Sequence, residues 1–176
     1  MLAFLSISLG LWENLRQLWL QNNGMEVTQI SNVLSLGTFI CVIAIIIFAK
    51  KVKPTRHKAF ISVAIILKIA NLLLLFGYNG SESLEIIKVL IIIGIILERL
   101  IIISIYPLIV TIKKEDTIYS KRKLTEYLFK DVGILIGGIF IGRAIGGIIV
   151  DYNICLLISI MFLLFAFVAA IRNKTG

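Results

Sequence analysis

The sequence alternates between long apolar runs and short polar connectors. A run of about 20 mostly apolar residues is long enough to cross the hydrocarbon core of a bilayer as a helix. The pattern predicts five such helices, at residues 30–49, 59–78, 86–111, 131–150 and 153–171. The chain therefore has repeated segments of the length and polarity of transmembrane helices.

A sixth span is predicted at residues 3–20, where the pattern is weaker. This segment is apolar as far as Trp12 and is then interrupted by Glu13, Arg16 and Gln17. We expect six transmembrane helices, with five as the alternative if this first segment does not span. The spans and connectors together form a single transmembrane domain over residues 1–176.

The composition favours lipid as the surrounding medium. Hydrophobic residues make up 59% of the chain, charged residues only 16%, and the mean hydropathy is +1.02. A water-soluble domain of this size could not bury so much apolar surface in one core. The fold class predicted is therefore an all-α integral membrane protein.

The net charge of +8 carries information about orientation. In a soluble protein it would suggest nucleic acid as a partner, but here Lys and Arg gather in short connectors and we expect no such partner. Basic connectors alternate with connectors that lack Lys and Arg. The basic ones are residues 50–58, 113–123 and 172–174, and the others are residues 21–28, 78–85 and 151–153. Since basic loops stay cytoplasmic, we expect a multi-pass protein of the cell membrane with both termini in the cytoplasm. Five spans would put the N-terminus outside.

Several polar residues lie inside the predicted spans, where ionisable side chains are costly and often functional. The candidates for a substrate or ion pathway are Glu13, Arg16, Lys68, Asn71, Glu98, Arg99, Tyr106 and Arg143. Glu13 and Arg16 are three residues apart, so they share a helix face on which they can pair. A structural ion pair between helices is the alternative to a functional site for Glu98, Arg99 and Lys68.

A polar stripe is predicted along the span at 86–111. At 100° per residue, Lys88, Arg99 and Tyr106 fall on nearly one face, which we expect to point inward, with Glu98 about 100° to one side. For Lys88, snorkelling to the outer interface is the alternative.

Cations outnumber carboxylates at membrane depth. The bases are Arg16, Lys68, Arg99 and Arg143, against Glu13 and Glu98. We expect something anionic to balance them: an anionic small-molecule substrate, a coupling acid, or carboxylates on a partner chain.

A glycine-rich stretch is the most specific local pattern. Gly138, Gly142 and Gly146 recur at spacings of four, and Gly147 follows directly. Such spacing lets another helix approach closely, so these glycines are predicted to serve helix packing.

No catalytic or metal-binding motif is present. The sequence has no phosphate loop, HExxH or GxSxG motif, and Cys41 and Cys155 have no metal-like spacing. A membrane protease would need a nucleophile and base at one depth, whereas Cys41 lies inside a span and His57 beyond its end. We expect no enzyme activity, cofactor or metal.

The order of these features resembles one six-helix half of a transporter of the major facilitator superfamily. Residues 138–147, GIFIGRAIGG, resemble the GxxxGPxxGG pattern of the fifth helix of a half, with Arg143 in place of proline. The basic loop KKVKPTRHK at 50–58 occupies the place of the loop between the second and third helices, although the usual acidic residue and glycine are absent. The stretch KLTEYLFKD at 123–131 resembles the segment before the eleventh helix, which favours the C-terminal half. Residues 121–130, KRKLTEYLFK, have amphipathic spacing, and we expect them to lie along the inner membrane surface before Asp131 begins the next span.

The resemblance implies secondary transport of a small solute by alternating access, along a path between two six-helix halves. The second half would be a separate chain or a second copy of this one. In such a half, Glu13, Arg16, Lys68, Glu98 and Arg99 are the cavity candidates, and Arg143 belongs to the rocking interface or has a coupling function. An alternative function is that of a membrane-embedded substrate-binding subunit in a multi-component transporter.

Overall fold

The computed structural model describes most of the backbone and most of the side chains. The backbone is described outside residues 52–56, 78–83, 116–120, 150 and 173–176. Side chains are described outside those segments and also outside residues 14, 48–51, 57–58, 106–115, 121–128 and 172. Tyr106, one of the predicted pathway residues, therefore lies outside the described side chains.

All secondary structure in the described residues is helical. The six helices are α1 (Leu2–Asn22), α2 (Val27–Lys51), α3 (His57–Phe76), α4 (Leu84–Glu115), α5 (Lys121–Ile148) and α6 (Tyr152–Arg172). The predicted fold class is confirmed as all-helical. The largest difference from the predicted boundaries is at α5, which begins ten residues before Asp131 because the amphipathic stretch 121–130 continues directly into the apolar one.

Four of the helices are long and apolar enough to cross a membrane. These stretches are Val27–Ile47, Ala59–Phe76, Phe129–Ile148 and Tyr152–Ile171. Between their charged residues, α1 and α4 are also apolar, but Glu13 and Arg16 interrupt α1 and Glu98 and Arg99 interrupt α4. The structure thus supports a membrane protein with at least four helices suited to span a bilayer.

The turn after α1 has a defined geometry. Gly24 adopts a φ of 83°, a left-handed conformation that glycine takes at little cost. The Met25 N–H donates to Leu20 O at 3.1 Å and the Gly24 N–H donates to Gln21 O at 3.0 Å, which together form a Schellman motif. The buried Met25 side chain completes the helix end, so α2 can fold back along the bundle.

A short connection joins α5 to α6. Asp151 Oδ1 accepts hydrogen bonds from the Asn153 N–H at 2.8 Å and the Ile154 N–H at 3.4 Å. An aspartate in this position satisfies backbone donors that the first turn of a helix leaves unpaired. Asp151 therefore sets the start of α6.

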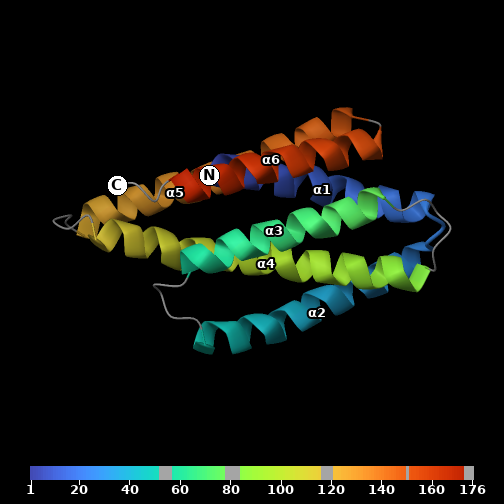
Figure 1. Cartoon of the computed structure of the whole chain (residues 1–176), viewed down its shortest axis with the longest axis horizontal. Helices are drawn as coiled ribbons and strands as arrows, with labels where there is room; N and C mark the ends of the chain where they lie inside the picture. Colours follow the sequence, from blue (N-terminus) through green and yellow to red (C-terminus); the bar gives the residue numbers. More distant parts are fainter. Residues whose placement is uncertain (52–56, 78–83, 116–120, 150, 173–176) are drawn as a thin grey trace.

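Consecutive helices run in opposite directions along the bundle (Figure 1). One triplet consists of α1 packed against α5 and α6, and the other of α4 packed against α2 and α3; contacts between α3 and α6 join them. Buried Leu, Ile, Ala and Trp side chains from these helices fill the centre. The main contacts therefore follow the order α5–α1–α6–α3–α4–α2, with α5 and α2 at the two ends.

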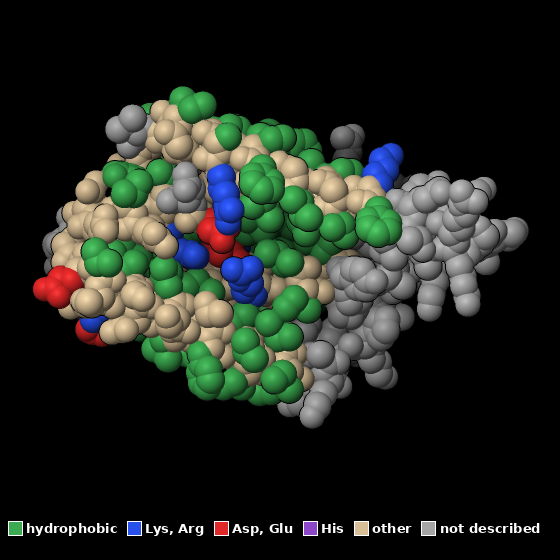
Figure 2. Space-filling model, turned by 180° about the vertical axis from the view of Figure 1, so that it is seen from behind, with side chains coloured by type: hydrophobic (Ala, Val, Ile, Leu, Met, Phe, Trp, Pro, Cys, Tyr) green, Lys and Arg blue, Asp and Glu red, His purple; other side chains and the backbone are tan. Residues whose placement is uncertain are grey.

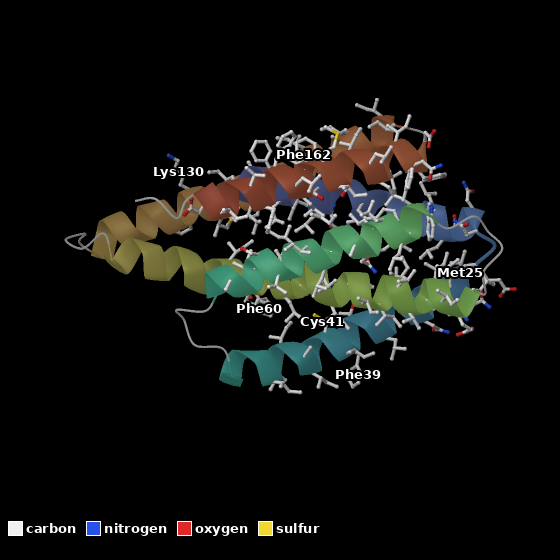
Figure 3. All side chains as sticks on the ribbon, viewed as in Figure 1. Met25, Phe39, Cys41, Phe60, Lys130 and Phe162 are labelled. Carbon is white, nitrogen blue, oxygen red and sulfur yellow. The ribbon has the colours of Figure 1, made fainter. Side chains whose placement is uncertain are left out.

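Helix α2 lies along one edge of the bundle and turns one side away from it. Figure 3 shows Phe39 on that side and Cys41 between α2 and α4. Phe39 is 64% exposed, whereas Cys41 is only 2% exposed. An exposed apolar helix face of this kind requires lipid or another protein surface to cover it.

Candidate functional site

Glu98 on α4 lies at the centre of a buried charge cluster. Lys68 Nζ, from α3, lies 2.6 Å from Glu98 Oε1, and Arg16 Nη1, from α1, lies 3.2 Å from Glu98 Oε2. All three residues are buried, and Lys68 is only 1% exposed. A buried charge is costly unless it is paired, so this triad accounts for how three charged residues are kept inside the bundle.

Lys68 and Asn71 also attach α3 to the backbone of α4. Lys68 Nζ donates to Gly94 O at 3.3 Å, and Asn71 Nδ2 donates to Leu90 O at 2.9 Å. A Cβ at Gly94 would lie 2.8 Å from Asn71 Oδ1 and 3.2 Å from Lys68 Nζ. Gly94 therefore provides the space that these two polar side chains occupy.

A second ion pair joins α1 to α5. Arg143 Nη2 lies 2.8 Å from Glu13 Oε2, and the two side chains are 46% and 32% exposed. Their spacing of three would allow Glu13 and Arg16 to pair with each other within α1. Instead, each pairs with a residue of another helix, because α1 has α5 on one side and the interior with α4 on the other.

The prediction that the stripe of Lys88, Arg99 and Tyr106 on α4 points inward is wrong for Arg99, and the Tyr106 side chain is not among those described. Glu98 points inward, but Arg99 is exposed. Glu98 takes the inward direction because α1 and α3 supply its counter-charges, and a 100° step along the helix then carries Arg99 off that face. Lys88 pairs with Glu85 at 2.5 Å near the start of α4, which is consistent with a position at the membrane interface.

Charged side chains gather on one face of the molecule. Figure 2 shows basic side chains around acidic ones there, with hydrophobic side chains on both sides. Arg99, the residue next to Glu98, is exposed, and so in part is the Glu13–Arg143 pair, whose Glu13 lies three residues before Arg16 on α1. The buried triad therefore has an accessible polar edge.

The predicted glycine packing occurs between α5 and α1. A Cβ at Gly138 would overlap Ser6 Oγ, and one at Gly142 would overlap Ile7 O; at Gly146 it would lie 3.1 Å from Leu11 O. These glycines allow the backbones of the two helices to approach closely. Gly147 is exposed, so it does not belong to this contact.

Two further features of the α1 interface were not found from the sequence. A Cβ at Gly10 would overlap Ile139 O, so the close approach depends on glycines from both helices. The spacing of Ser6 and Gly10, four apart, was the signal that could have revealed it. In addition, Ser8 Oγ and Ser159 Oγ form a buried hydrogen bond of 2.7 Å between α1 and α6.

Several hollows on the described surface lie beside α2. One, of about 470 Å³, is shallow and lined by side chains of α2 alone, including Phe39 and Val42. Another, of about 200 Å³, lies between α1 and α2 and includes Gln17, Gln21 and Ser31 in its lining. The second hollow gives the end of α1 beyond Arg16 a polar surface.

Among the described residues, no three His, Cys, Asp or Glu side chains are placed to hold a metal ion together. Cys41 and Cys155 are both buried and free. Cys155 packs with Leu11 and Leu15, as a small apolar side chain would. The chemistry that the described cluster offers is therefore electrostatic: cations and carboxylates that bind charged groups.

Comparisons of the chain with known protein families, with curated proteins and with solved structures found no match.

Proposed function

We propose that this chain is one six-helix half of a secondary transporter of the major facilitator type, which moves a small solute across the cell membrane by alternating access. The observation that carries the proposal is the pairing of its helices. Exchanging α1 with α4, α2 with α5 and α3 with α6 leaves the set of main helix contacts unchanged.

This exchange describes an inverted repeat of three helices. The pair α1–α5 becomes α4–α2, the pair α1–α6 becomes α4–α3, and the pair α3–α6 becomes itself. Consecutive helices alternate in direction (Figure 1), so the two repeats, α1–α3 and α4–α6, are inverted relative to each other along the bundle. Repeats of three and three with inverted topology occur within each half of major facilitator transporters.

The charge cluster joins the two repeats, which supports the proposal. In inverted-repeat transporters the substrate site is near the membrane midplane, at the interface between the repeats. Here Arg16 belongs to the first repeat, α1–α3, and Glu98 to the second, α4–α6, and Arg16 Nη1 lies 3.2 Å from Glu98 Oε2. The same two helices, α1 and α4, are the ones exchanged by the symmetry.

The exposed apolar surfaces of α2 and α5 support the proposal that a second six-helix half packs against this one. Within their apolar stretches, 22% of the residues of α2 and 17% of those of α5 are buried, compared with 39% in both α3 and α6. The symmetry exchanges α2 with α5, so both triplets leave the corresponding helix uncovered. We propose that a second six-helix half, either a separate chain or another copy, packs against these two helices.

The exposure of Arg99 supports a water-filled path beside α4. This residue is exposed and lies well inside α4, where contact with lipid would cost several kcal/mol. A water-filled path between the two halves removes this cost. In the proposed arrangement all six helices span, and the basic connectors keep both termini in the cytoplasm.

Purification in mild detergent and transport in proteoliposomes test the proposal together. We expect a complex of two six-helix halves that takes up a solute from a labelled metabolite panel, and we expect Lys68→Gln to abolish uptake. Lys88→Gln is the matched control, since it removes one Lys charge outside the cluster. A stoichiometric complex with an ATP-hydrolysing subunit would instead support the substrate-binding-subunit alternative, and a monomer with full activity would contradict the need for a second half.

A further inference from the structure

We infer that the charge cluster of α1, α3, α4 and α5 binds a small anion that carries a carboxylate or phosphate group. The inference rests on the proposed function for the aqueous path by which the anion arrives. It names the class of ligand that the site takes.

The described carboxylates of the cluster are already engaged. Both oxygens of Glu98 are taken by cations, Oε1 by Lys68 and Oε2 by Arg16. Glu13 binds Arg143. Since one carboxylate serves two cations in the triad, the triad carries one excess positive charge, and Arg99 adds a second.

Arg16 has donor capacity that the folded chain leaves unused. Its Nε is buried and has no hydrogen-bond partner among the described residues, and the whole residue is 8% exposed. Its contact with Glu98, at 3.2 Å, is longer than the 2.7–2.9 Å typical of charged pairs. A buried guanidinium with an unpaired N–H and a long ion pair is suited to donate a hydrogen bond to a further anionic oxygen.

Access to the cluster is from its exposed edge. Among the described side chains, none forms an ion pair with Arg99. Arg99 is exposed and is the residue next to Glu98, and the half-exposed Arg143 binds Glu13, which lies three residues before Arg16 on α1. An anion entering at this edge meets the Arg99 guanidinium before it reaches the buried triad. Figure 2 shows a face of the molecule on which Lys or Arg side chains lie around acidic ones.

The chemistry of arginine selects the ligand. A guanidinium presents parallel N–H donors that match the two oxygens of a carboxylate or phosphate. A neutral sugar would leave the excess charge uncompensated, and a cation would increase it. Carboxylate and phosphate groups therefore fit the cluster best, whether carried by a soluble solute or by an anionic lipid headgroup.

Binding can be measured separately from transport. The full chain, with any partner that copurifies, is placed in phosphatidylcholine nanodiscs, and thermal unfolding is followed by the fluorescence of Trp12 and Trp19. The probes are inorganic phosphate, succinate and glycerol 3-phosphate, with sodium chloride at equal ionic strength, glycerol and choline as controls. The variants are Arg99→Gln and Arg143→Gln, with Lys88→Gln as the matched control.

We expect at least one anionic probe to raise the unfolding midpoint by about 3 °C or more in the wild type and in Lys88→Gln. The rise should be lost in Arg99→Gln, which should itself be no less stable without ligand because it removes an uncompensated charge. Arg143→Gln should show a smaller rise than the wild type.

Adding an anionic lipid to the nanodiscs shows whether the anion comes from a soluble solute or from a lipid headgroup. A midpoint rise on adding phosphatidylglycerol, absent with every soluble probe and lost in Arg99→Gln, assigns the site to a lipid headgroup. No rise with any soluble or lipid anion overturns the inference. Loss of a copurifying chain in Arg99→Gln, with a lower midpoint, also overturns it, since carboxylates of the partner then balance the charge. An anion-dependent rise without any transport would leave this site in place and refute the proposed function instead.

Discussion

Lys68 Nζ and Glu98 Oε1 lie 2.6 Å apart, joining two charged residues of adjacent helices that are thirty positions apart in the sequence. Neither side chain has more than a small exposed fraction, and Arg16 from a third helix reaches the other oxygen of the same carboxylate. The polar interior of the bundle is thus organised around one acidic residue. This arrangement makes Glu98 the most informative position for mutation.

Replacing Glu98 with Gln should destabilise the protein strongly. The change leaves Lys68 and Arg16 buried without their counter-charge, and removing one partner of a buried pair costs about 3–5 kcal/mol. The measurement is the free energy of unfolding in a detergent titration. Glu85→Gln is the matched control, because its pair with Lys88 is exposed at the end of α4 and its loss should cost less than about 1 kcal/mol. Equal stabilities of the two variants would show that Glu98 does not neutralise the interior cations.

Gly142→Ala and Gly137→Ala should differ in thermal stability, although both glycines are in α5. A methyl group at Gly142 meets the backbone of α1, whereas nothing lies within 4 Å of a Cβ at Gly137. Overpacking costs about 1–3 kcal/mol, so the thermal midpoint of Gly142→Ala should fall. Gly137→Ala should be neutral or slightly stabilising, because alanine favours a helix over glycine. A fall of equal size in both would disprove the close contact between α1 and α5.

The hydrogen bond between Ser8 and Ser159 should contribute a small coupling energy. Hydrogen bonds between helices in membrane proteins average about 0.6 kcal/mol in double-mutant cycles. We expect Ser8→Ala, Ser159→Ala and the double variant to give a coupling of that size in unfolding experiments. Strict additivity of the single changes would mean that the two hydroxyl groups do not interact.

A double variant that exchanges the charges of Glu13 and Arg143 should recover the stability that each single charge reversal loses. Glu13→Arg places two cations together between α1 and α5, and Arg143→Glu places two carboxylates together. Because both side chains are partly exposed, solvent screening limits the coupling to about 0.5–1 kcal/mol. The thermal midpoints of the two single variants and the double variant measure it, and a double variant less stable than either single one would contradict the pairing.

The position of the N-terminus tests whether α1 spans. A green fluorescent protein fused before Met1 should fluoresce if the N-terminus is cytoplasmic, as six spans require. A cysteine introduced at Asn23, in the turn after α1, should react with an impermeant maleimide in intact cells. Background labelling should be low, since Cys41 and Cys155 are buried. Fluorescence without labelling at Asn23 would mean that α1 does not cross the membrane.

Much of the fold follows from the pattern of apolar residues. Apolar runs of about 20 residues in lipid satisfy their backbone hydrogen bonds only as helices, so the positions of α2, α3 and α6 were predicted to within a few residues. Spacings of four predicted that Gly138, Gly142 and Gly146 serve one contact, and the structure assigns that contact to α1. The early start of α5 was not predicted, since an amphipathic stretch also fits a separate surface helix.

The partners of the charged residues could not be predicted in this way. Helical periodicity shows that Glu13 and Arg16 share a face, but it does not show which neighbouring helix that face meets. Arg143 lies 130 positions from Glu13, and Glu98 lies 82 positions from Arg16. The sequence by itself thus determined which segments are helical and which residues are charged at depth, because these properties depend on local composition and hydrogen bonding. The tertiary structure alone decided that Glu98 faces inward and Arg99 outward, because the rotation of each helix depends on packing and counter-charges supplied by distant parts of the chain.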